Sequence, residues 1–155
     1  MKKIVFIALL FAMLLTGNVF GQTGWAIGGD FAFNWSGTAY PYGAALCVKF
    51  PQLPIMFGIS ANFTQPVVMG ITADWWLFQS HLVGPVNIYI GPGLFLGIDT
   101  GPNGTARFGI RIPIGFQIFI VKVFEIFIEP AISIELVPQL PTFGVQAALG
   151  FRFWF

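Results

Sequence analysis

Residues 108–118, FGIRIPIGFQI, alternate bulky apolar residues with small or polar ones. Phenylalanine and isoleucine occupy every even-numbered position, whereas glycine, arginine, proline and glutamine occupy the odd-numbered positions. Successive side chains of a β-strand point to opposite faces of its sheet. This two-residue period therefore predicts a strand with one apolar face and one polar face.

The same period recurs from residue 25 to residue 155 and predicts eight antiparallel strands. They cover residues 25–35, 46–50, 55–63, 67–75, 86–98, 107–118, 124–136 and 143–155. Segments rich in glycine, proline and polar residues separate them, as turns require. Gly91-Pro92-Gly93 interrupts the fifth segment, but the alternation keeps its phase from residue 86 to residue 98. We therefore predict one strand there, with a bulge at the proline; the alternative is that Gly91-Pro92-Gly93 divides the segment into two strands.

Charged side chains follow the polar phase of these strands. Beyond residue 21 the chain has eleven of them, five basic and six acidic. Nine lie on the polar phase: Asp30, Lys49, Asp74, Arg107, Arg111, Glu125, Glu129, Glu135 and Arg152. The other two, Asp99 and Lys122, fall at a strand end and in a turn. A lysine or arginine that faces mid-bilayer lipid costs about 2–4 kcal/mol, so this distribution favours a lipid-facing apolar phase.

The overall composition also favours a membrane. Only 8% of the residues are charged and 56% are hydrophobic, whereas a water-facing surface needs about 25–35% charged residues. The alternative is a soluble, lipocalin-like barrel that buries the apolar phase. The polar phase is mostly small residues, which suit the narrow interior of eight strands better than a solvated exterior. We predict an all-β fold, an eight-stranded antiparallel up-and-down transmembrane β-barrel preceded by a cleaved signal peptide.

The first 21 residues have the anatomy of that signal peptide. Lys2 and Lys3 precede an apolar run over residues 4–15, and Gly21 offers a small residue at the cleavage position. The alternative is a membrane-anchoring helix, but the run is shorter than the about 20 residues that a span requires. We therefore predict a signal peptide over 1–21, export, and one barrel domain over 22–155.

The C-terminal residues Gly150, Phe153 and Phe155 resemble the terminal assembly signal of outer-membrane barrels, a glycine followed by aromatics at the third-last and last positions. The chain beyond residue 21 resembles the small eight-stranded outer-membrane barrels of the OmpA/OmpX type. This resemblance implies an integral outer-membrane location, contact with outer-membrane lipid and insertion by the barrel-assembly machinery. It transfers no particular activity.

The polar phase places several ionisable residues inside the barrel, where buried charges must be paired or solvated. A turn over residues 119–123 would put Arg107 opposite Glu135 and Gln117 opposite Glu125, with Arg152 approaching Glu129. We predict a lumen charge network that plugs the barrel: Arg107, Arg111, Arg152, Glu125, Glu129 and Glu135. A gated ion path through the same residues is the alternative.

The sequence offers few signs of chemistry. Ser80-His81 contains the sole histidine, and adjacent residues in a turn seldom form a nucleophile–base pair. A single cysteine, Cys47, excludes an internal disulfide and a cysteine-rich metal site, and no basic cluster suggests nucleic acid. We predict no catalysis, cofactor or metal, and a monomer with a structural or interaction role. The alternatives are a narrow channel or port for small or hydrophobic solutes, and a membrane-embedded lipid-modifying enzyme.

Overall fold

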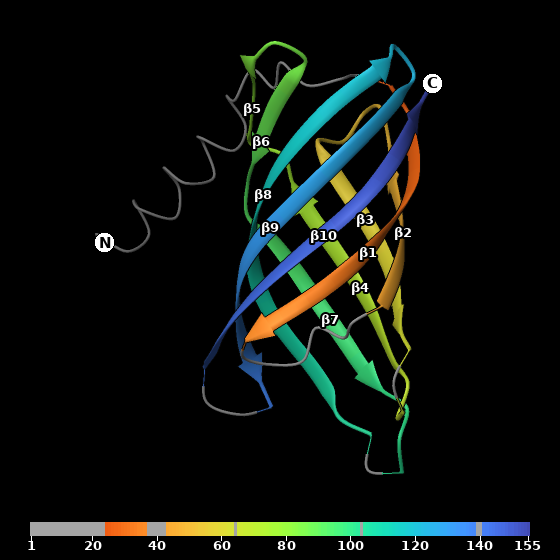
Figure 1. Cartoon of the computed structure of the whole chain (residues 1–155). Coiled ribbons are helices and arrows are strands. Elements are labelled where there is room, and N and C mark those ends of the chain that lie inside the picture. The colour runs from red at the N-terminus through yellow and green to blue at the C-terminus, as the bar shows by residue number, and fades with distance from the viewer. Residues whose placement is uncertain (1–23, 37–42, 64, 103, 139–140) are drawn as a thin grey trace, which may run out of the picture.

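The computed structural model describes residues 24–36, 43–63, 65–102, 104–138 and 141–155, so the predicted signal peptide lies outside the described residues. Ten antiparallel strands form one closed sheet (Figure 1). They are β1 (Ala26–Ser36), β2 (Gly43–Lys49), β3 (Ile55–Asn62), β4 (Val68–Trp75), β5 (Phe78–Val83), β6 (Val86–Ile90), β7 (Gly93–Asp99), β8 (Ala106–Val121), β9 (Phe124–Val137) and β10 (Thr142–Trp154). Among the described residues, no helix has the length and apolar character to cross a membrane.

The ten strands occupy eight strand positions around the barrel, as predicted, and we call each position a stave. β4 pairs with β7 and β5 pairs with β6, so β4–β5 and β6–β7 each act as one interrupted stave. β6 and β7 both pair with β8 in a single continuous register, from Val86 opposite Ile118 to Ile98 opposite Ala106. β1 pairs with both β2 and β10, and β8 pairs with β9, which closes the sheet.

The fourth stave is longer than predicted. The prediction ended it at Trp75, but the chain continues through β5 to Val83. Between the two parts, the Leu77 amide donates to the Trp75 carbonyl, and the Trp75 amide donates to Pro92, whose own nitrogen has no hydrogen to donate. The sequence pattern did not predict this extension, because β5 has little apolar alternation. Three polar residues are consecutive in it: Gln79, Ser80 and His81.

The β8–β9 hairpin has a register different from the predicted one. Glu135 lies opposite Gly109 and Glu125 opposite Phe119, two residues away from the predicted partners Arg107 and Gln117. The predicted turn over 119–123 contains no glycine or proline. Its apolar residues instead extend β8 to Val121, which leaves a tight turn before β9 begins at Phe124.

The two faces of the sheet differ as the alternation predicted. Large apolar side chains cover the outside, and Leu46 and Ile59 are 68% and 61% exposed. All nine charged residues of the polar phase lie on the inner face, where seven are buried and two, Asp30 and Arg107, are half-buried. A surface of this kind suits hydrocarbon, because apolar side chains need no hydrogen-bond partner there.

Aromatic side chains fill part of the lumen by lying over glycines of the neighbouring strand. Tyr89 is opposite Gly115, and a Cβ added at Gly115 would lie 1.8 Å from the Tyr89 Cζ. Phe127 is opposite Gly150, where an added Cβ would lie 2.7 Å from the phenylalanine ring. Each glycine therefore makes room for a ring that projects across the barrel.

Candidate functional site

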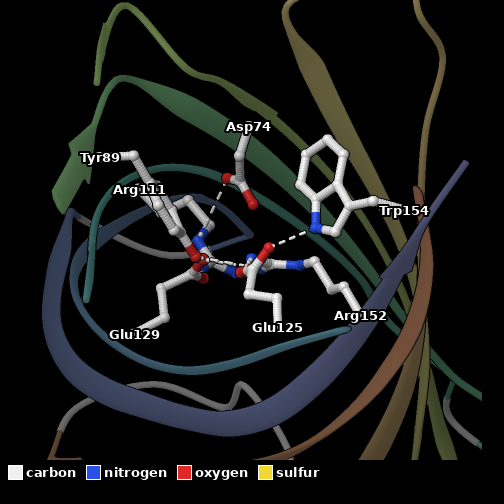
Figure 2. A network of polar contacts seen from close by, with 7 residues as sticks. All are labelled: Asp74, Tyr89, Arg111, Glu125, Glu129, Arg152 and Trp154. Carbon is white, nitrogen blue, oxygen red and sulfur yellow. Dashed lines mark hydrogen bonds and ion pairs between the residues drawn. The ribbon is translucent and has the colours of Figure 1, made fainter. Parts of the chain in front are cut away.

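Arg152 of β10 is the centre of a buried polar network inside the barrel (Figure 2). Its Nη1 donates to Glu125 Oε1 at 2.6 Å, and its Nη2 donates to the Tyr89 hydroxyl at 3.0 Å. The guanidinium also lies over the Phe127 ring, 3.5 Å from its centroid. The second oxygen of Glu125 accepts a hydrogen bond of 2.6 Å from Trp154 Nε1. Both charges are almost fully buried.

Arg111 of β8 forms the second part of the same network. Its Nη2 donates to Glu129 Oε1 at 2.5 Å, and its Nε lies 3.3 Å from Asp74 Oδ1. Tyr89 donates its hydroxyl hydrogen to Glu129 Oε2 at 2.5 Å, and Arg152 Nη2 lies 3.7 Å from the same oxygen. Tyr89 and Glu129 therefore join the two arginines into one continuous set of contacts across the lumen.

The network differs in membership from the predicted one. Arg111, Arg152, Glu125 and Glu129 come together, and Arg152 does approach Glu129. Arg107 and Glu135 are not part of it. Glu135 is buried opposite Gly109, and no ion pair joins it to Arg107 among the described residues. The two-residue shift of the β8–β9 register is the physical reason, since it moves Glu135 away from the position facing Arg107.

Asp74, Tyr89 and Trp154 are the members that the sequence prediction missed. Asp74, Gly93 and Arg111 lie in one row across β4, β7 and β8. A Cβ at Gly93 would lie 1.9 Å from Asp74 Oδ1, so only a glycine lets the carboxylate pass over it towards Arg111. Asp74 was on the predicted polar phase, but its partner depends on which strands are neighbours.

An aromatic cluster closes the end of the lumen at which the chain termini of the barrel lie. The rings of Trp76 and Tyr89 stack with centroids 4.1 Å apart, and Trp154 lies 6.2 Å from Trp76. Phe119 packs against the outside of this cluster. We call Trp76, Tyr89, Phe119 and Trp154 the aromatic cap. Trp76, Tyr89 and Trp154 are at most 4% exposed, so the cap is closely packed.

Solved structures share this architecture. The N-terminal β-barrel domain of Pseudomonas aeruginosa OprF is 15% identical, with a TM-score of 0.51 over 86% of this chain and 99% of that chain. Neisserial surface protein A (NspA) is 14% identical, with a TM-score of 0.53 over 85% of this chain and 97% of that chain. The fold is that of the small eight-stranded outer-membrane barrels. No family model matches the sequence, and no curated protein sequence matches it.

The predicted residues Ser80 and His81 of this outer-membrane-type barrel lie apart from the network. Ser80 and His81 are exposed on β5, and they do not bond each other through their side chains: Ser80 Oγ donates to the His81 carbonyl at 3.3 Å, and the imidazole Nε2 lies 2.8 Å from the Gly84 carbonyl oxygen. Cys47, in contrast, is buried and faces inward, where its thiol contacts the side chain of Arg152. Within the described ranges, no group of three histidine, cysteine or acidic residues could hold a metal ion.

The predicted assembly signal lies on and just after β10. Gly150 is opposite Asp30 of β1 and Phe127 of β9, at the seam that closes the barrel. Phe153 and Phe155 face outward and are exposed. Phe153 contacts Phe124 with ring centroids 4.9 Å apart. These two aromatics are therefore available at the surface, while the glycine makes room inside.

Proposed function

We propose that this protein is an integral barrel of the bacterial outer membrane whose lumen is plugged by its own side chains, with a structural or interaction role and no catalysis. The observation that carries the proposal is the buried network of Arg111 and Arg152 with their carboxylate partners. It crosses the lumen, and the aromatic cap lies directly beyond it. A continuous water-filled pathway would require both the charge network and the aromatic cap to open.

The exterior supports the membrane location. Its exposed side chains are overwhelmingly apolar, and the charges are gathered inside. Export through residues 1–21, insertion by the barrel-assembly machinery through Gly150, Phe153 and Phe155, and a monomeric state complete the proposal. Cell fractionation tests the location: the mature chain should be in the outer membrane and begin near Gln22. Recovery from the inner membrane with the leader intact would contradict it.

Electrical recordings in planar lipid bilayers test the plug. Refolded protein should give no stable conductance steps, although heat-modifiable electrophoretic mobility shows that the barrel has formed. The charge network would block ions because each of its charged members already holds a partner of opposite charge. Stable steps from the wild-type protein that change size in Arg111→Ala, but not in the matched turn variant Lys122→Ala, would support a channel and overturn the plug.

A further inference from the structure

A recess occupies the lumen on the side of the charge network away from the aromatic cap. Its cavity volume is about 40 Å³. The floor contains the Arg111–Glu129 pair, and the walls include three inward-facing alanines: Ala32, Ala45 and Ala148. Ala32 and Ala45 face inward but remain partly exposed, whereas the cap residues are buried. Solvent therefore reaches the recess from the end of the barrel opposite the cap.

Three polar side chains that line this recess have unused bonding capacity. Asp30 forms no hydrogen bond or ion pair with another side chain in the described part of the chain, although it is half-buried. The Ser60 hydroxyl and the Gln146 Nε2 have no hydrogen-bond partner among the described residues, and these side chains are 8% and 4% exposed. A buried polar group without a partner costs about 1–3 kcal/mol, so these atoms favour a molecule that would bond them.

The sheet register places Asp30 and Ser60 around one small residue. Asp30 lies opposite Ala45 on β2, and Ala45 lies opposite Ser60 on β3. Neighbouring strands are about 4.8 Å apart, so the two backbone positions lie about 10 Å apart with only a methyl group between them. The carboxylate and the hydroxyl thus flank an open part of the wall, and Gln146 lies further along β10 towards the mouth.

The balance of charge in the recess selects a cation. Its lining contains three carboxylates, Asp30, Asp74 and Glu129, and two guanidinium groups, Arg111 and Arg152. Both arginines already pair with carboxylates, and Arg152 also pairs with the buried Glu125. An anion would have to break these pairs. A cation could use the carboxylate of Asp30 without breaking any contact that the described structure contains.

We propose that this recess binds a small protonated amine. The ammonium group would donate to the Asp30 carboxylate and the Ser60 hydroxyl oxygen, since charge-assisted hydrogen bonds are the strongest available to such a group. The short alkyl part would rest on Ala45 and Ala148. A hard metal ion fits less well, because calcium takes six to eight oxygen ligands and the described residues contain no cluster of three acidic, histidine or cysteine side chains that could hold a metal.

Binding of ethylammonium to the refolded full-length chain tests the proposal, measured by saturation-transfer NMR and calorimetry. Ethanol and propionate are the neutral and anionic probes of similar size. Asp30→Asn should weaken ethylammonium binding about tenfold or more, and Ser60→Ala about two- to tenfold, as expected for a charge-assisted and an ordinary hydrogen bond. Ala45→Leu should abolish binding, because the larger side chain would occupy the recess while every charge stays in place.

Asp99→Asn is the matched control, because it removes a carboxylate from the end of β7, outside the recess, and keeps the oxygen that accepts from the Gly101 amide. It should bind ethylammonium as the wild type does. Absence of binding by folded wild-type barrel, equal binding of propionate, or full competition by sodium or potassium would each overturn the assignment. Conductance is recorded separately, so failure here is distinguishable from failure of the plug.

Discussion

Replacement of Arg152 by methionine is the most direct test of the charge network. Methionine keeps most of the length and the apolar stem of the side chain but removes the guanidinium. The variant loses the 2.6 Å bond to Glu125 and the 3.0 Å bond to the Tyr89 hydroxyl. Glu129 keeps Arg111 and Tyr89 as partners. The main energetic cost of the substitution is therefore the loss of the ion-pair partner of Glu125.

The size of the effect follows from the burial of Glu125. This side chain has no exposed surface, and after the substitution Trp154 Nε1 is the one donor to it that remains among the described residues. Breaking a buried ion pair by removing one partner costs about 3–5 kcal/mol, because the remaining charge is left uncompensated. We expect R152M to lower the free energy of unfolding by that amount. The double variant R152M/E125Q should recover about 1–3 kcal/mol relative to the sum of the single variants.

Urea titration of barrels refolded in lipid vesicles measures these free energies, with heat-modifiable mobility and tryptophan fluorescence as independent readouts. Arg107→Met is the control, since Arg107 is half-buried and outside the network, and it should cost about 1 kcal/mol or less. A folded R152M variant that loses no more free energy of unfolding than R107M would refute this role of Arg152. The same role is refuted if E125Q adds to R152M without any coupling.

Two further substitutions test the packing and the lipid-facing surface with the same titration. Gly115→Ala should cost about 1–3 kcal/mol because its Cβ would overlap the Tyr89 ring, whereas Gly97→Ala, whose Cβ would have no neighbour closer than 3.8 Å, should change stability little. Leu46→Lys should cost about 2–4 kcal/mol on the lipid-facing side of β2, and Leu53→Lys in the following turn about 0–1 kcal/mol. Equal losses within either pair would contradict the assigned positions.

Much of the fold could be predicted because alternation is a local property. Each inward or outward position between residues 106 and 118 depends only on its parity within one strand. The number of staves followed from counting such segments. The extension of the fourth stave through β5 escaped this reasoning, because its six residues are exposed or half-buried on both faces and leave no two-residue pattern to read.

The partners within the lumen could not be predicted to the same degree. The alternation predicted that Asp74 and Glu135 face the lumen, but it did not predict the ion-pair partner of either residue. That depends on register, and the tip of the β8–β9 hairpin, residues 121–123, contains no glycine or proline to fix it. A register shift of two residues preserves every inward and outward assignment, so the alternation does not distinguish the two registers. The shift nevertheless replaces the cross-strand partner of every charged residue on the strand.

The lumen is filled from one side. The long inward side chains come from β6, β8, β9 and β10, whereas the facing positions in the middle of β1, β2 and β3 are small. Arg152 shows the consequence, since its Cγ lies 2.8 Å from where a Cβ of Gly28 would be. Long residues on one wall reach over small residues on the other, which is how a narrow barrel accommodates two arginines. Where no long side chain reaches, beside Ala45 and Ser60, the recess remains. The plug and the recess are therefore two results of the same uneven distribution of side-chain size around the barrel.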